Sequence, residues 1–413
     1  MTSPRATRNP FAALPREVAV LAAVALAVSV GFGIVAPAIP IFARQFGVGE
    51  TAAGAVISAF ALMRFVSALA GGKMVDVFGE RVILTTGILI VAVSTGLAGL
   101  AESYEWLLVM RAAGGVGSAM FTVSALALLY RVVESHRRGS ATSLFRGGFL
   151  IGGLLGPLLG GVFTGIDVRL PFFIYAGSLI VAGLIGAVFL ANARLRDESP
   201  GHSGTDEPPT PLREAVSQSA YRTALAVNFG IGWALFGVRI SLIPLFVTVA
   251  MGEDVFWVGV GFLASSLAQA ALLLPAGRYV DEVGRRPAMV LGGLVAGGGL
   301  LLIAASTLLW VYLIAMLLFG AGSALMASAP GAVVGDVMRG RGGKVVAVFQ
   351  MSSDLGAIIG PIAAGWLAAH VSYSAAFMVS AGVLFFGVLM SWRMPETRRP
   401  ASQQPADNPE PTD

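Results

Sequence analysis

The chain repeats one ten-residue stretch, Gly72-Lys-Met-Val-Asp76-Val-Phe-Gly79-Glu-Arg81, as Gly277-Arg-Tyr-Val-Asp281-Glu-Val-Gly284-Arg-Arg286. The second copy lies 205 residues after the first. Both copies place an aspartate one turn after a glycine and end on a second glycine with an arginine two residues later. A carboxylate at this position can accept hydrogen bonds from a neighbouring helix N-terminus, and the second glycine permits a tight return of the chain.

Further matches outside this stretch keep the same spacing, which indicates two duplicated halves with the same topology. Their shifts are 204 or 205 residues: Gly115-Val-Gly117 with Gly320-Ala-Gly322, Gly152-x-x-x-Gly156-Pro157 with Gly356-x-x-x-Gly360-Pro361, and Pro40 with Pro244.

The composition indicates a membrane protein. Apolar residues make up 56% of the 413 residues and charged residues only 12%, against roughly 25% charged residues in soluble domains. With no cysteine and three histidines, the chain offers no disulfide framework or cysteine metal site, and we expect no metal or cofactor. Twelve stretches have the length and hydropathy of membrane helices: 18–42, 52–72, 82–101, 106–128, 140–163, 171–192, 222–249, 255–276, 287–306, 309–334, 344–369 and 374–392.

The distribution of Lys and Arg predicts the orientation of these spans. Basic residues gather on the loops of one side, whereas only Arg44 and Arg169 lie in loops of the other side. The positive-inside rule therefore places both termini in the cytoplasm, with the chain in the inner membrane of the cell. The net charge of +4 follows from this topology and does not indicate nucleic-acid binding. We predict five segments: a cytoplasmic tail (1–17), a six-helix bundle (18–192), a Pro-rich cytoplasmic linker (193–220), a second six-helix bundle (221–392) and a disordered cytoplasmic tail (393–413).

The repeated ten-residue loop resembles the loop signature of the major facilitator superfamily, and the resemblance covers residues 18–392. It implies an all-α membrane fold of twelve helices in two six-helix bundles. It also implies that the loops act as latches between the halves on the cytoplasmic side; an ordinary capping loop is the alternative. In the first copy, Val77 and Glu80 stand where the family usually has basic residues, which predicts a weaker first latch. The implied latch residues are Gly72, Asp76, Gly79, Arg81, Gly277, Asp281, Gly284, Arg285 and Arg286.

Small residues line one face of the fifth predicted span. Glycines at i, i+4 and i+8 let a neighbouring backbone approach closely, and Pro157 bends the helix. The string Gly152, Gly156, Pro157, Gly160 and Gly161 resembles the motif of the drug:proton antiporter branch, whose members export their substrates. The first span, with Gly31-Phe-Gly33 and Pro37-Ala-Ile-Pro40, resembles a signature of the same branch. Close packing without export is the alternative interpretation.

Four arginines lie inside the predicted spans, where an ionisable group needs a cavity or a partner. Arg111 opens a stretch that resembles the buried-arginine motif of the family and implies proton coupling, and snorkelling to the interface is the alternative. Arg64 and Arg239 are expected near the bilayer midplane, with Arg146 nearer the cytoplasm. Asp354 is the only acid expected near the midplane. We predict that Asp354 pairs with Arg64, Arg239 or both and releases them when protonated. A fixed ion pair is the alternative, because neighbouring positive charge disfavours protonation.

An excess of buried arginine over acid suits an anionic or amphipathic small-molecule substrate. The sequence predicts a monomeric secondary transporter that works by alternating access and exports amphipathic drugs or metabolites in exchange for protons. Import or exchange of organic anions is the alternative within transport, and a receptor or scaffold on the same fold is a third interpretation. We expect no enzyme and no ATP-driven pump, since neither a Gly-x-x-x-x-Gly-Lys-Ser/Thr phosphate loop nor a Ser–His pair stands out.

Overall fold

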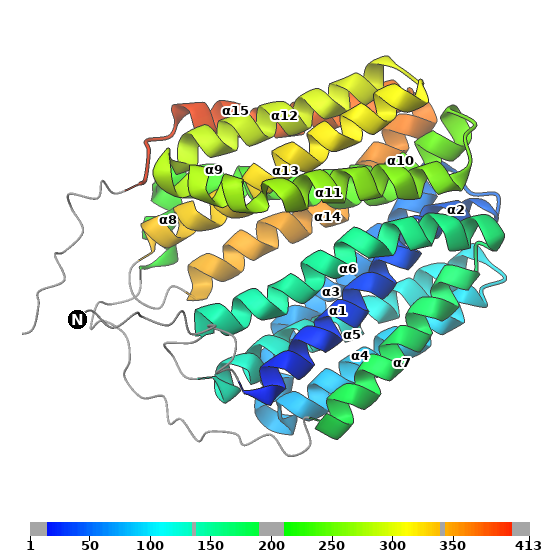
Figure 1. The fold of residues 1–413 in the computed structure, drawn as a ribbon, viewed down its shortest axis with the longest axis horizontal. Coiled ribbons are helices and arrows are strands. Elements are labelled where there is room, and N and C mark those ends of the chain that lie inside the picture. The colour runs from blue at the N-terminus through cyan, green and yellow to red at the C-terminus, as the bar shows by residue number, and fades with distance from the viewer. Residues whose placement is uncertain (1–14, 134–137, 190–209, 339–342, 399–413) are drawn as a thin grey trace, which may run out of the picture.

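A computed structural model describes residues 15–133, 138–189, 210–338 and 343–398, and all regular elements in these ranges are helical. The helices lie side by side along the long axis of the molecule in two groups (Figure 1). The first group contains α1 (Arg16–Val35), α2 (Ala38–Arg44), α3 (Glu50–Phe78), α4 (Glu80–Gly99), α5 (Tyr104–Val132), α6 (Arg138–Ile166) and α7 (Leu170–Phe189). The second contains α8 (Leu212–Ser217), α9 (Ser219–Gly232), η2 (Trp233–Leu242), α10 (Ile243–Leu245), η3 (Phe246–Ala250), α11 (Val255–Glu282), α12 (Arg285–Ala305), α13 (Leu309–Val337), α14 (Gly343–His370) and α15 (Tyr373–Arg393).

Eleven helical segments in the described residues are long and apolar enough to cross a membrane. They include the continuous segments Arg16–Arg44 and Ser219–Ala250, each built from more than one element. The fifth predicted span falls in α6, a helix of 29 residues whose described apolar part, Leu155–Ile166, is shorter than a span. The chain is thus a multi-pass membrane protein, and the described residues supply eleven of the twelve predicted spans.

Helix ends follow from local capping chemistry. The first backbone N–H groups of a helix have no partner within it, and a side-chain oxygen just before the helix can accept from them. Ser103 caps α5 by accepting from the Trp106 N–H at 3.2 Å, and Asp254 caps α11 by accepting from Phe256 at 2.7 Å. The turn between α3 and α4 uses Gly79 at φ 80°, a conformation that side chains with a Cβ rarely adopt.

Two spans depart from a straight α-helix. In the first, α1 ends at Val35 and α2 begins at Ala38, with Pro37 between them, because proline supplies no backbone N–H and clashes with the preceding turn. The seventh predicted span continues from α9 into the ten-residue π-helix η2 and, after Pro244, into a second π-helical stretch. π-Helical turns are rare and often occur at functional positions, and nothing in the sequence indicated this one.

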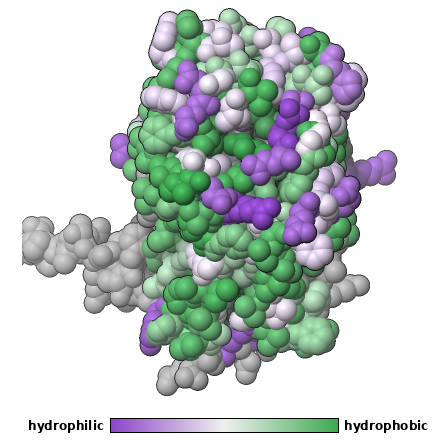
Figure 2. Space-filling model, turned by 90° about the vertical axis from the view of Figure 1, so that its right-hand side faces the viewer, coloured by the Kyte–Doolittle hydropathy of each residue, from purple (hydrophilic) through white to green (hydrophobic). Residues whose placement is uncertain are grey.

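Most buried apolar side chains belong to two large clusters, and many other apolar side chains lie on the outer surface. One buried cluster is formed by residues of the first group together with Ile240 and Leu245, and another by residues 215–394. Many large apolar side chains remain exposed on the sides of the molecule, as expected for surfaces that face lipid. Figure 2 shows the end that carries α2 and α10, where hydrophilic residues gather between hydrophobic ones.

Glycine contacts inside the two groups occur in matching pairs. Gly87 and Gly117 bring α4 against α5, and a Cβ added at Gly117 would lie 2.5 Å from the Gly87 carbonyl oxygen. Gly292 and Gly322, each 205 residues later, do the same for α12 and α13, again at 2.5 Å from oxygen to the added Cβ. Without a hydrophobic drive between helices in lipid, such close approach of backbones is a main source of attraction.

The predicted packing motif of the fifth span also has a counterpart. Gly156 faces Gly33 on α1, and Gly360, 204 residues later, faces Gly237 on η2. A Cβ added at Gly160 would lie 2.5 Å from the Ile34 carbonyl oxygen. These contacts show that Gly156, Gly160 and Gly360 serve close helix packing within their own groups.

The two groups meet along α3 with α14 and along α6 with α11. Gly54 lies against the Pro361 carbonyl, and Ser58 Oγ donates to the Ile358 carbonyl at 2.6 Å. On the other seam, a Cβ added at Gly161 would lie 3.0 Å from the Gly259 Cα atom. These contacts lie toward the end that carries α2 and α10, which we call the α2/α10 end; the opposite end carries α8 and is called the α8 end (Figure 1).

The predicted polar segments differ in part from the structure. Most of the predicted linker lies outside the described residues, but its last part forms α8 and the start of α9. The predicted disordered tail begins with residues that are described: Arg393 ends α15, and residues 394–398 continue along the protein. Glu396 in this stretch hydrogen-bonds to the start of α12, and such contacts were not expected from its Pro-rich and polar composition.

Replacing Gly322 by alanine should lower stability, because the new Cβ would meet the Gly292 carbonyl oxygen at 2.5 Å. Overpacking of this kind typically destabilises by about 1–3 kcal/mol. The matched control is Gly298→Ala, also in this pair of helices, where an added Cβ meets nothing within 4 Å. The measurement is the melting temperature of the detergent-purified protein, and equal melting temperatures for the two variants would contradict the packing role of Gly322.

Candidate functional site

An ion pair joins the two groups halfway along α3. Arg64 lies fourteen residues from either end of that helix, about 21 Å at 1.5 Å per residue. Its Nη2 atom is 2.5 Å from Oδ1 of Asp354 on α14, and both side chains are mostly buried, at 30% and 24% exposure. The Arg64 guanidinium also lies over the Phe236 ring of η2, 5.8 Å from its centroid. The structure therefore brings together the predicted pair of Asp354 and Arg64.

Arg239 makes a different set of contacts from those predicted. Its Nη2 atom donates to Ser266 Oγ at 2.6 Å and to the Phe262 carbonyl at 3.2 Å, and its guanidinium lies 5.1 Å from the centre of the Phe262 ring. Ser266 Oγ donates in turn to the Gly153 carbonyl of α6 at 3.1 Å. Arg239 thus supports a hydrogen-bonded bridge across the α6–α11 seam instead of sharing Asp354.

The π-helix η2 connects the two bridges. Phe236 contacts Arg64, and Arg239, three residues later, contacts Ser266. A π-helix has more residues per turn than an α-helix, which changes the directions in which its side chains leave the backbone. Arg239 was a predicted site residue, but its bond to Ser266 and the contact of Phe236 with Arg64 were not predicted, because the change in helix type has no signal in the residue pattern.

Arg111 lies inside the first group. Its side chain is only 2% exposed, so it does not reach the surface as a snorkelling arginine would. The guanidinium lies over the Phe60 ring at 4.5 Å, and the buried Nε atom has no hydrogen-bond acceptor among the described residues. In the described part of the chain, the positive charges of Arg111 and Arg239 are therefore stabilised by aromatic rings and neutral acceptors rather than by carboxylates.

Some predicted site residues cannot be placed by their side chains. The side chains of Arg146 and Asp76, and the surroundings of Gly72, lie outside the described part of the structure. The backbone of Arg146 belongs to α6, and the backbones of Gly72 and Asp76 belong to α3. The side chains of the first predicted latch are described from Met74 onward, except for that of Asp76.

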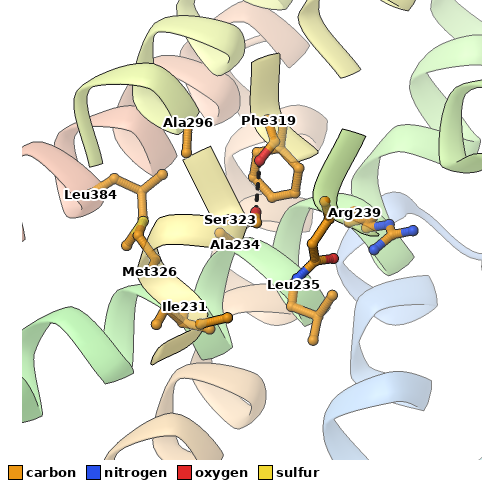
Figure 3. Close-up of a pocket in the computed structure, with 11 residues that line it drawn as sticks. Ile231, Ala234, Leu235, Arg239, Ala296, Phe319, Ser323, Met326 and Leu384 are labelled. Atoms are coloured by element: carbon orange, nitrogen blue, oxygen red, sulfur yellow. Dashed lines mark hydrogen bonds between the residues drawn. The ribbon is translucent and has the colours of Figure 1, made fainter. Parts of the chain in front are cut away.

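A small cavity of about 90 Å³ lies within the second group, beside η2. Figure 3 shows Met326 and Leu384 facing Ile231 across it, while the Arg239 guanidinium points away from these apolar side chains. Polar atoms at this cavity include the Gln269 amide and the Ser323 hydroxyl, which donates to the Phe319 carbonyl at 2.7 Å. The cavity is therefore an apolar space with a few polar groups, but it is smaller than the roughly 300–1,000 Å³ of a typical ligand pocket.

A larger cavity of about 520 Å³ lies next to the first one and shares Met326 and Ala327 with it. Its other residues come from the last turns of α13, the first turns of α14 and the middle of α9, which lie toward the α8 end. Asn228 at its wall donates to the Phe349 carbonyl at 2.7 Å, and Gln350 supplies a second amide. The residues that line the two cavities run from the last turns of α13 to η2, and they include Gln350, one turn before Asp354 on α14.

The second latch loop is held within its own group. Arg285 Nε donates to Asp336 Oδ2 on α13 at 3.0 Å, and Arg285 Nη1 lies 3.4 Å from Asp281 Oδ1. Gly284 makes the turn at φ 139°. Asp281 is 74% exposed, and Arg286 contributes its backbone N–H to a bond with Glu396.

The two groups carry the same ion pair with the charges exchanged. Glu80 at the start of α4 binds Arg131 near the end of α5, with Nη1 2.6 and 2.8 Å from the two carboxylate oxygens. Arg285 and Asp336, 205 residues after each, form the corresponding pair, and both pairs span 51 residues of chain. The acid at Glu80, unusual for the family signature, is thus matched by a basic partner. The pairing of Arg131 and of Asp336 was not predicted, although the same 205-residue shift relates these two positions.

The whole-chain comparison decides the family. A model described as Major Facilitator Superfamily matches residues 21–266 and 240–412. The chain belongs to the major facilitator superfamily. Membership identifies it as a membrane transporter rather than an enzyme, in agreement with the relatives that it resembles.

Similar members of the superfamily include named multidrug resistance proteins. Multidrug resistance protein MdtG of Salmonella paratyphi C is 27% identical over 382 residues, which cover 89% of this chain and 92% of that protein. Multidrug resistance protein 1 of Bacillus subtilis is 23% identical over 372 residues, covering 88% and 93%. Among solved structures, a bacterial homologue of the human lysosomal transporter Spinster, in an inward-facing and unoccupied conformation, aligns with a TM-score of 0.70 at 16% identity, covering 91% of this chain and 94% of that one. This last likeness shows the shared fold.

The exchanged ion pairs of this superfamily member predict a charge-swap rescue. Glu80→Arg alone should lower the melting temperature, because it places an arginine against Arg131 in a site where the native Glu80 is 7% exposed. Adding Arg131→Asp gives the charge order of the second half and should recover most of the loss, with a coupling free energy of about 1–3 kcal/mol between the two positions. The melting temperatures of the two single variants and the double variant test this. Additive losses in the double variant would show that the two side chains do not depend on each other.

Proposed function

We propose that this transporter works by alternating access and exports amphipathic drugs or metabolites in exchange for protons. The observation that carries the proposal is the Arg64–Asp354 ion pair, with a nitrogen–oxygen distance of 2.5 Å, which joins the two groups halfway along α3. A carboxylate in this position can connect a proton to the contact between the halves. Related proteins named for multidrug resistance support export.

The proposed membrane arrangement has twelve spans in two six-helix halves, with α6 as the fifth span. The matched contacts Gly87–Gly117 and Gly292–Gly322, together with the exchanged ion pairs, support a duplicated architecture. The α8 end and both termini face the cytoplasm, because this end carries the basic loops. The protein acts as a monomer in the inner membrane, with residues 18–192 and 221–392 as its two bundles.

We infer that the described state is open toward the cytoplasm. The α2/α10 end is closed by glycine contacts and by bonds such as Ser58 to the Ile358 carbonyl. The cavity of about 520 Å³ lies on the opposite side of the ion pair. Opening toward the outside then requires the contacts of α3 with α14 and of α6 with α11 to separate near their closed ends.

Protonation of Asp354 would weaken the bridge to Arg64, because a neutral carboxyl group loses the charge-assisted part of the hydrogen bond. Arg64 would keep its contact with the Phe236 ring, so the released guanidinium would still have a favourable neighbour. The proposed cycle alternates between a paired state, which holds α3 against α14, and a protonated state, which lets the two helices separate.

A second candidate function is the import or exchange of organic anions. The observation that favours it is the lack of a carboxylate partner for Arg111 and Arg239 among the described residues. Guanidinium groups bind carboxylates and phosphates well. Anionic amphiphiles satisfy both candidates, because Arg239 is one of the residues that line the cavity beside Met326, whose other walls are mostly apolar.

Asp354→Asn should abolish coupling to the proton gradient while the protein remains folded. The side chain keeps its size and can still hydrogen-bond Arg64, but it can no longer take up a proton or carry charge. The assay uses proteoliposomes with an imposed pH gradient, a panel of labelled amphipathic cations and anions, and a pH-sensitive dye for proton movement. We expect at least a ~10-fold loss of gradient-driven flux, equivalent to ~1.4 kcal/mol.

The control for this experiment is Glu102→Gln, which removes an exposed acid from a loop at the α2/α10 end. It should transport and move protons as the parent does. Substrate-linked proton movement that is unchanged in Asp354→Asn would overturn the coupling role. Gradient-driven entry of anions into cells, without export, would favour the second candidate function.

Ala327→Phe should block transport by filling the space where the two cavities meet. Ala327 lines both cavities, and a phenyl ring there would occupy the path along α13. The matched control is Ile314→Phe on the same helix, where the side chain is 44% exposed on the outer surface. We expect a loss of flux of at least ~10-fold for Ala327→Phe and near-parent flux for Ile314→Phe, measured in the same proteoliposomes. Equal flux in both variants would place the substrate path elsewhere.

A further inference from the structure

The segment that follows α15 folds back onto the start of α12. The two oxygens of the Glu396 carboxylate accept from the backbone N–H groups of Arg285 at 2.9 Å and Arg286 at 3.0 Å. These N–H groups begin a helix and have no partner within it, and the helix dipole favours a negative charge at this place. Glu396 therefore caps α12 from more than a hundred residues away.

A second contact ties the same segment to the ion pair of the second latch loop. Thr397 Oγ1 donates at 2.8 Å to Asp336 Oδ2, the same oxygen that accepts from Arg285 Nε. Arg285 Nη1 also donates to the Val280 carbonyl at 2.8 Å. The segment thus closes a polar cluster that holds together the end of α11, the start of α12 and the end of α13.

The contact with Glu396 requires a glycine at position 284 of the second loop. A Cβ added at Gly284 would lie 2.5 Å from one carboxylate oxygen of Glu396 and 3.2 Å from the other. At the corresponding Gly79 of the first loop, an added Cβ meets nothing within 4 Å. The need for glycine at 284 therefore comes from the approach of Glu396 as well as from its positive φ.

We propose that residues 394–398 form a strap that holds the second latch loop (277–286) in its own half and thereby favours the state open at the α8 end. The inference rests on the proposed alternating access and on the latch role of the loop. Arg285 is 15% exposed and bound by Asp336 within its own half. For this loop to contact the first half, the cluster must loosen, and Glu396 and Thr397 oppose that movement.

The absence of cysteine from the chain allows a direct test with single introduced cysteines. Ser58→Cys reports opening of the α2/α10 end, where the serine is 3% exposed and bonded across the seam. Gly335→Cys reports the cavity at the α8 end, which Gly335 lines and where an added Cβ meets nothing within 4 Å. The measurement is the rate of labelling by a membrane-impermeant maleimide in vesicles of each orientation.

The strap is altered in three ways, each combined with each probe: Glu396→Gln, Thr397→Val, and a chain that ends at Pro395. Each should slow labelling at the Gly335→Cys probe and speed labelling at the Ser58→Cys probe, by at least about threefold for the truncation, which removes several hydrogen bonds of ordinary strength. The matched control is Glu214→Gln, an exposed acid on α8 at the same end, which should label as the parent does. Thr397→Val leaves the cap on α12 intact, so it tests the strap even if loss of that cap unfolds the other variants.

The outcomes separate the strap from the function on which it rests. If the parent shows labelling at both probes that responds to pH or to transported substrate, alternating access holds. Strap variants that then label like the parent, or that shift the two probes in the opposite directions, overturn the strap. If the Ser58→Cys probe stays unlabelled in the parent under every condition, while Gly335→Cys labels, alternating access itself fails.

Discussion

Gly87 against Gly117, and Gly292 against Gly322, bring helix backbones closer than any side chain would allow, and the rest of the architecture depends on this approach. Helices in lipid gain no hydrophobic stabilisation from leaving water, so van der Waals contact between backbones carries much of their association. The same requirement returns between the groups, where Gly161 faces Gly259. Close contact holds the helices of each group together, and close contact at the α2/α10 end of the seam holds the two groups together there.

The ion pairs of this protein join either helices of the same group or helices of different groups. At the α8 end, Glu80 with Arg131 and Arg285 with Asp336 tie neighbouring helices of the same group. Halfway along the helices, the Arg64–Asp354 pair ties different groups. An ion pair inside a rigid bundle stabilises one structure, whereas an ion pair across a seam can favour one of two arrangements. In the proposed cycle, the difference between a structural role and a switching role is therefore one of position, since both kinds of pair join an arginine to a carboxylate.

Much of the site could be predicted because ionisable residues are rare within the spans. Asp354 had few possible partners, and the pair with Arg64 was among those predicted. The contact of Arg239 with Ser266 was not predicted, because it depends on the π-helical turns of η2, which alter side-chain directions without a mark in the sequence. The Glu396 cap was missed for another reason: a Pro-rich polar segment has no periodic pattern that shows what it will contact.

The sequence by itself determined the membrane class, the repeat at 204 or 205 residues, the family and eleven of the spans that the structure describes. Hydropathy and spacing are properties of the chain alone, and helix formation in lipid satisfies the backbone locally. Only the tertiary structure decided which end of the seam is closed, that Arg239 bridges to Ser266 rather than to Asp354, and that the two groups carry exchanged ion pairs. These features depend on contacts between helices far apart in the sequence, whose geometry follows from packing and not from the order of residues.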